Sequence, residues 1–201
     1  MGKQERGIQT IQRVLDAALV CFTSRGVYAA TIHELADESK VSIGSLYHHF
    51  GSRDRIALAL YCRCQEQLWA SVKAAVLEER DARTGIRRLV LAYLTWAADN
   101  RDAARFIHQV AHSEFVSRWQ GELGASHERL LAPLLDWLAN KVKSRELVEL
   151  SPALFEVAIL GPPSEFVRRW LSGTPELDLE QAVRILPDAV WRSVARKSEL
   201  S

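Results

Sequence analysis

The chain has 201 residues, of which 48% are hydrophobic and 25% are charged. This mixture excludes a disordered or low-complexity chain and is typical of a globular protein with one large or two smaller domains. The formal net charge is +1, and the first 60 residues carry seven Lys and Arg against six Asp and Glu, again a net charge of +1. A broad basic surface is therefore excluded, so any attraction to nucleic acid depends on the local placement of a few groups.

The three cysteines, Cys21, Cys62 and Cys64, predict neither a disulfide framework nor a zinc site, because they lack paired spacing. We expect ordinary thiols in a reducing compartment, with a redox sensor as the alternative. The sequence shows no signal peptide and no apolar run long enough to span a membrane. We therefore expect a cytoplasmic protein without a membrane partner.

The N-terminal segment predicts a helix that ends at Gly26, a residue that favours helix ends. Its apolar residues recur at the spacing of one helix face, and they are Ile11, Val14, Leu15, Ala18 and Phe22. A short second helix follows, because Thr31 and Glu34 form a capping box. This helix is expected to end near residue 40.

A third, short helix is predicted from Ile43 to His49, with Ser42 as its N-cap and Gly51 at its end. A long fourth helix is expected from about residue 53 to about residue 79. Further helices are expected near residues 85–100, 102–118, 125–145, 151–172 and 178–197. No segment shows sustained strand-like alternation, so the sequence predicts an all-α protein of about nine helices.

Two of the later helices have recognisable starts, at Ser151-Pro152 and at Asp178. The run Gly161-Pro162-Pro163 falls inside the first of them. Because proline removes a backbone donor and collides with the preceding turn, we expect a kink or break there.

Only the four residues from Glu38 to Val41 separate the second and third helices. Two short helices joined by such a tight turn are typical of a helix-turn-helix, whose second helix enters the DNA major groove. An ordinary helical hairpin is the alternative that spacing alone leaves open.

The residues of this region resemble the DNA-binding domain of the TetR (TetR/AcrR) family over roughly residues 8–60. The similarity rests on Ile11, Arg13, Val14, Leu15, Ala17, Ala18, Phe22, Gly26, Thr31, Leu35, Ala36, Val41, Ser42, Gly44, Ser45, Leu46, Tyr47, His49 and Phe50. Arg53 stands where the family usually has Lys. The resemblance implies a helix-turn-helix DNA-binding domain over 1–52 and a larger helical regulatory and dimerisation domain over 53–201.

The implied DNA-binding residues are Thr31, Ser42, Ile43, Gly44, Ser45, Tyr47, His48 and Arg53. Thr31, Ser42 and Arg53 stand at helix starts, where free backbone N–H groups favour phosphate, and Tyr47 offers a hydroxyl suited to a phosphate oxygen. Lys3 and Arg6 offer a basic arm toward the backbone or minor groove. The third helix lacks Arg or Asn for a bidentate base contact, so we expect readout through a thymine methyl, water or DNA shape.

The resemblance also implies a homodimer, since one short recognition helix reads few bases. Dimerisation is expected through the last two helices, at Phe155, Ile159, Phe166, Trp170, Leu186 and Val190. A small-molecule effector is expected near Trp96, Phe106, His108, His112 and Phe115. Ordinary core packing is the alternative for these aromatic residues, and no metal site is expected at the two histidines.

These observations predict a dimeric transcriptional regulator, a repressor released from a palindromic operator by an effector. The alternative is a ligand-independent DNA-binding protein whose C-terminal domain only dimerises. The sequence shows no nucleophile–base pair, phosphate loop or metal-ligand cluster, so we expect neither an enzyme nor a cofactor.

Overall fold

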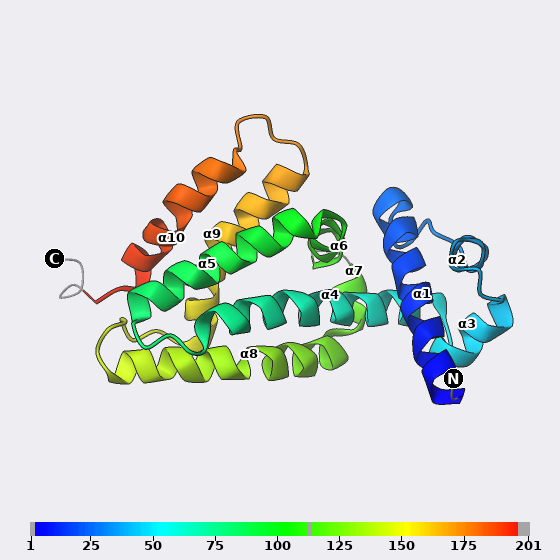
Figure 1. Cartoon of the computed structure of the whole chain (residues 1–201), viewed down its shortest axis with the longest axis horizontal. Coiled ribbons are helices and arrows are strands. Elements are labelled where there is room, and N and C mark those ends of the chain that lie inside the picture. Colours follow the sequence, from blue (N-terminus) through cyan, green and yellow to red (C-terminus); the bar gives the residue numbers. More distant parts are fainter. Residues whose placement is uncertain (1–2, 112–113, 197–201) are drawn as a thin grey trace. The chain divides into compact units, whose positions relative to one another are not determined.

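The computed structural model describes residues 3–111 and 114–196 (Figure 1). In this part of the chain the regular elements are helices, apart from one isolated bridge between Leu147 and Ala195. The helices are α1 (Lys3–Arg25), α2 (Ile32–Ser39), α3 (Ile43–Phe50), α4 (Arg53–Val76), α5 (Ala82–Asp99), α6 (Arg101–Ala111), α7 (Glu114–Arg118), α8 (Gln120–Lys143), α9 (Pro152–Leu171) and α10 (Leu179–Val194). The all-α prediction is confirmed.

The predicted helix starts are confirmed where short-range capping sets them. The Ser151 hydroxyl accepts a hydrogen bond from the backbone N–H of Leu154 at 3.3 Å, at the start of α9. At the start of α10, the Asp178 carboxylate accepts from the backbone N–H of Gln181 at 2.7 Å. Such caps satisfy N–H groups that have no partner within the helix.

The helix does not break at Gly161-Pro162-Pro163, because α9 is one helix from Pro152 to Leu171, and the expected kink stays a prediction. Pro163 is buried. The two prolines remove two backbone donors from the helix interior. Packing of the surrounding helix therefore outweighs the local preference against helix that the sequence shows.

The chain divides into two compact units, and α4 begins in the first and ends in the second. The first unit comprises Met1–Gln65 and Asp102–Leu123, and the second comprises Glu66–Arg101 and Gly124–Ser201. The first unit thus contains α1–α3 together with α6 and α7, so it is larger than the predicted domain 1–52. The boundary between residues 52 and 53 stays a prediction.

An aromatic stack lies in the core of the first unit. The rings of Phe22 on α1 and Phe106 on α6 have centroids 5.9 Å apart and are inclined by 16°. Both side chains are fully buried. This contact fixes α6 against α1, the helix that also packs against α2.

The second unit is built on contacts among α5, α9 and α10, and α9 and α10 lie side by side (Figure 1). The helix α8 also contacts α5, because Trp137 of α8 packs directly on Gly85 of α5. The indole N–H of Trp137 donates to the backbone carbonyl of Glu79 at 2.9 Å. These contacts hold α8 against α5 with the indole fully satisfied.

Candidate DNA interface

The start of α2 is fixed by the predicted capping box. The backbone N–H of Glu34 donates to the Thr31 hydroxyl at 3.3 Å, and the backbone N–H of Thr31 donates to the Glu34 carboxylate at 2.8 Å. The latter bond, helped by the ion pair with Arg25, lowers the pKa of Glu34 below its ordinary value. Thr31 is exposed, so the first turn of α2 faces solvent.

The turn between α2 and α3 depends on a left-handed residue. Lys40 has a φ of 55° and a ψ of 34°, and its backbone N–H donates to the carbonyl of Ala36. Val41 follows and is buried. The exposed Lys40 therefore sits at the corner of the helix-turn-helix, while Val41 anchors the corner to the core.

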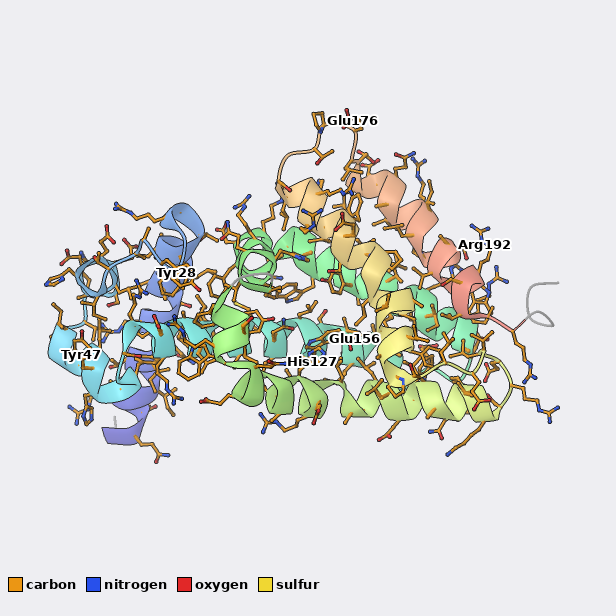
Figure 2. The ribbon with its side chains drawn as sticks, turned by 180° about the vertical axis from the view of Figure 1, so that it is seen from behind. Tyr28, Tyr47, His127, Glu156, Glu176 and Arg192 are labelled. Carbon is orange, nitrogen blue, oxygen red and sulfur yellow. The ribbon has the colours of Figure 1, made fainter. Side chains whose placement is uncertain are left out.

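The helix α3 presents one polar face to solvent. Ser42 caps it by accepting from the backbone N–H of Ser45 at 3.3 Å. Leu46 is buried, whereas Tyr47 is 50% exposed (Figure 2). Nothing lies within 4 Å of the position a Cβ would take on Gly44, so the backbone there is open to close approach.

The predicted DNA-binding residues fall into two groups by exposure. Thr31, Ser42, Gly44, Tyr47 and His48 are exposed, and Ile43, Ser45 and Arg53 are half-buried. The predicted arm contains Arg6, which is exposed, and Lys3, whose side chain lies outside the described residues. Thr31, Ser42 and Gly44 stand at the starts of α2 and α3, and Tyr47 and His48 are exposed farther along α3. Free backbone N–H groups at such helix starts suit phosphate contacts beside a groove.

Arg53 is engaged inside the protein. One of its terminal nitrogens, Nη1, donates to the carbonyls of Tyr28 and Ala30 at 2.9 and 3.1 Å. The other, Nη2, donates to the carboxylate of Asp54 at 3.0 Å. Three of its five N–H donors are therefore already used, which leaves two for other partners. The predicted phosphate contact of Arg53 stays a prediction.

Two further residues join the candidate interface that the sequence alone did not single out. Lys40 is the only Lys or Arg between residues 31 and 52, and it is exposed at the turn. Tyr28, in the loop before α2, is 51% exposed (Figure 2). The signal for Lys40 was present in the sequence, namely a lone cation at the corner of a helix-turn-helix.

The residues predicted to bind an effector are mostly core residues. Trp96, Phe106 and Phe115 are buried, His108 is half-buried, and His112 lies outside the described residues. Trp96 belongs to the second unit, and Phe106, His108 and Phe115 belong to the first.

A cavity of about 30 Å³ lies within the second unit and is lined by other residues. They are Trp69, Leu89, Leu131, Leu134, Leu135, Leu138, Phe155, Glu156, Ile159 and Leu160. The charged member of the lining, Glu156, has an oxygen 3.0 Å from Nε2 of His127 (Figure 2). The His127 ring in turn meets Trp69 edge-on, with centroids 6.4 Å apart. The surface that lines the cavity is apolar, and the pair of His127 and Glu156 lies beside it.

The residues predicted to form a dimer interface are also partly internal. Phe155, Ile159 and Val190 are 5%, 1% and 1% exposed within the single chain, so their side chains are already covered. Phe166 and Trp170 stack on each other, and the Arg101 guanidinium lies 4.6 Å from the Trp170 ring centroid. Leu186, Phe166 and Trp170 are half-buried.

Within residues 3–111 and 114–196, no three His, Cys, Asp or Glu side chains are grouped to hold a metal ion. Across the same described stretches, no helix combines the length and apolarity that crossing a membrane requires. Burial raises the pKa of the Cys64 thiol to about 11, so this thiol stays protonated at neutral pH.

Comparison with known proteins agrees with this geometry. Residues 14–60 match the family described as bacterial regulatory proteins, tetR family. Over 180 residues the chain is 24% identical to the HTH-type transcriptional activator FasR of Mycolicibacterium smegmatis, a match that covers 89% of this chain and 80% of that protein.

Two crystal structures share the fold. A TetR family transcription regulator from Marinobacter aquaeolei is 20% identical with a TM-score of 0.83, over 96% of this chain and 100% of that one. The transcriptional regulator FadR from Bacillus subtilis, solved in complex with stearoyl-CoA, is 17% identical with a TM-score of 0.75, over 90% and 98% of the two chains. The capped α2 and α3 and the match over residues 14–60 identify this part of the chain as a DNA-binding domain of the tetR family, and the chain as a whole has the fold of TetR family regulators.

Proposed function

We propose that the protein is a dimeric repressor that binds a pseudo-palindromic operator and leaves it when a small effector binds the second unit. The observation that carries the DNA-binding part is the pair of exposed helix starts, at Thr31 and Ser42, on either side of the turn at Lys40. Backbone N–H groups at such starts attract phosphate, and these contacts hold α3 in the major groove.

The exposed groups of α3 favour readout of DNA shape. The outward residues at its start are small, with Ser42 and Gly44 exposed and Ser45 half-buried. None of them forms the two parallel hydrogen bonds by which Arg or Asn selects a base. We propose that Gly44 allows close approach, that Ile43 meets a thymine methyl, and that deformability of the site supplies further selectivity.

Selection of duplexes from a random pool tests DNA binding directly. We expect recovered sites with two-fold symmetry and half-sites about 34–36 Å apart or a multiple of that spacing. Affinity for the recovered duplex should fall as salt rises, because bound phosphates release counterions. Recovery of no duplex that binds more tightly than random DNA would contradict the proposal.

The proposed dimer uses the uncovered apolar residues of α9 and α10. Leu154 and Val157 are 55% and 68% exposed on α9, three residues apart and so on one face of the helix. Ile185 on α10 is 50% exposed. Covering these side chains by a second copy removes apolar surface from water, which is the main driving force of such association.

The proposed effector is a molecule with an aliphatic part. Leucine, isoleucine and aromatic side chains line the cavity, and the polar pair of His127 and Glu156 lies beside it. The FadR protein of similar fold binds an acyl-CoA, stearoyl-CoA. We therefore propose long-chain acyl compounds as the first probes, added to the protein bound to its selected duplex.

The size of the cavity favours a second candidate function, a regulator that acts without an effector. About 30 Å³ holds one or two water molecules, so an acyl chain requires the helices to move apart. Release of the duplex by stearoyl-CoA supports the effector. Retention of the duplex at saturating concentrations of a panel of acyl compounds supports the alternative.

The direction of regulation follows from where the dimer binds. A dimer that covers a promoter blocks polymerase, which is why we propose a repressor acting in the cytoplasm, with no catalytic role. The similar FasR is named an activator. Transcription in vitro from a promoter containing the selected site distinguishes the two, since a repressor lowers and an activator raises the yield of transcript.

A further inference from the structure

The start of α4 carries a chain of polar contacts that runs through the first unit. The Arg118 guanidinium on α7 donates to one carboxylate oxygen of Asp54 at 2.9 Å, and the other oxygen accepts from Arg53 at 3.0 Å. Arg53 in turn donates to the carbonyls of Tyr28 and Ala30. Four hydrogen bonds thus connect α7 to the loop before α2.

This loop immediately precedes Thr31, the residue that caps α2. Its backbone has few bonds of its own, among them that from the N–H of Ala30 to the carbonyl of Gly26 at 3.2 Å. The forked guanidinium of Arg53 holds two of its carbonyls at once, which a lysine ammonium does with less rigidity. Arg53 and Asp54 have side chains only 28% and 26% exposed, so water competes weakly for these bonds.

We propose that Arg53 is a positioning residue that sets the loop before α2, and that Asp54 and Arg118 hold Arg53 in that position, so that α7 contributes to DNA affinity without touching DNA. The effect on DNA rests on the proposed function, whereas the effect on the loop does not. The new element is a role for an acidic residue in promoting DNA binding.

Neutralising Asp54 tests the proposal, because the proposal and simple charge repulsion predict opposite changes in DNA affinity. Removal of a negative charge near a DNA-binding surface normally strengthens binding, because repulsion from phosphate is reduced. If Asp54 positions Arg53, the substitution Asp54→Asn instead weakens binding to the selected duplex, by about fivefold. Asp37→Asn is the matched control, since Asp37 is an exposed carboxylate on α2.

Binding titrations over a range of salt concentrations then separate the two roles of Arg53. A positioning residue leaves the slope of log affinity against log salt unchanged in Arg53→Gln, although affinity falls. A direct phosphate contact lowers that slope by about one. Such a change of slope, or tighter binding by both Asp54→Asn and Asp37→Asn, overturns the proposal.

The double variant Asp54→Asn, Arg118→Gln tests whether Arg118 acts through its hydrogen bond to Asp54. If Arg118 acts through Asp54, the double variant binds DNA no more weakly than Asp54→Asn alone. If the two losses multiply, Arg118 acts on DNA independently and the proposal fails. Circular dichroism of each variant checks that the helices are retained.

Hydrogen exchange of the free protein tests the loop without DNA. We expect the Ala30 amide to exchange faster in Arg53→Gln, Asp54→Asn and Arg118→Gln than in the wild type, by about fivefold, and to be unchanged in Asp37→Asn. Unchanged exchange at Ala30 in all variants overturns the proposal. If the wild type selects no duplex, the proposed function fails, and this measurement alone decides the role of Arg53 in the loop.

Discussion

His127 on α8 and Glu156 on α9 face each other, with Nε2 and Oε1 3.0 Å apart at the edge of the apolar cavity (Figure 2). The bond from His127 lowers the pKa of Glu156 below its ordinary value. A carboxyl whose pKa is lower in the folded than in the unfolded chain contributes stability above the unfolded pKa. That contribution is lost as the pH falls through the folded pKa.

We therefore predict that Glu156→Gln destabilises the protein at neutral pH and that the difference from wild type shrinks at about pH 3, below the unfolded pKa. The expected loss is less than about 1 kcal/mol, because the Glu156 side chain is 42% exposed and solvent screens the pair. Urea unfolding at both pH values measures it. Glu128→Gln, an exposed carboxylate of α8, serves as control. An equal difference at both pH values would contradict the assignment.

Tyr47→Phe tests whether the most exposed aromatic of α3 contacts the DNA backbone. Loss of one hydroxyl bond to phosphate is expected to weaken binding by about three- to tenfold, with no change in protein stability. Fluorescence anisotropy with the selected duplex measures the affinity. Tyr61→Phe makes the same chemical change on α4, where the hydroxyl accepts from Gln65, and should leave affinity unchanged. Equal affinities for Tyr47→Phe and wild type would argue against the contact.

Val157→Asp tests the proposed dimer face. A charge introduced at a side chain that a partner covers is costly to bury, so we expect a shift from dimer to monomer at micromolar concentration. Analytical ultracentrifugation reports the mass. Val20→Asp is the control, because Val20 on α1 is 54% exposed and lies outside the proposed face. A dimer that persists in Val157→Asp, or a wild type that is monomeric, would reject this face.

The helix-turn-helix could be predicted from sequence because its signals are local. Thr31 and Glu34 form their capping box three residues apart, and Ser42 needs only the N–H of Ser45. Such contacts form between near neighbours in any helix start, so the residue pattern determines them. The position of Lys40 at the corner also follows from the spacing of the two caps.

The cavity could not be predicted, because its walls come from helices far apart in the sequence. Trp69 on α4 and Phe155 on α9 both line it, whereas Phe106, expected in a pocket, stacks on Phe22. Aromatic residues look alike in a sequence whether they pack in a core or face a ligand. The bond from Arg53 to Tyr28 likewise joins positions 25 residues apart and depends on the tertiary fold.

Gly85 on α5 is likewise constrained by a tertiary contact, with Trp137 on α8. A Cβ on Gly85 would overlap Cζ2 of Trp137, and the indole is fixed by its bond to the Glu79 carbonyl. Helix propensity alone favours alanine over glycine by about 0.5–1 kcal/mol. We predict that Gly85→Ala nevertheless destabilises the protein by about 1–3 kcal/mol, because the ring must leave its site. Gly121→Ala in α8 is the control with nothing within 4 Å, and it should be stabilising. Urea midpoints that rise for both variants would show that Trp137 has room to move, whereas opposite signs would show that the close contact fixes the packing of α8 on α5.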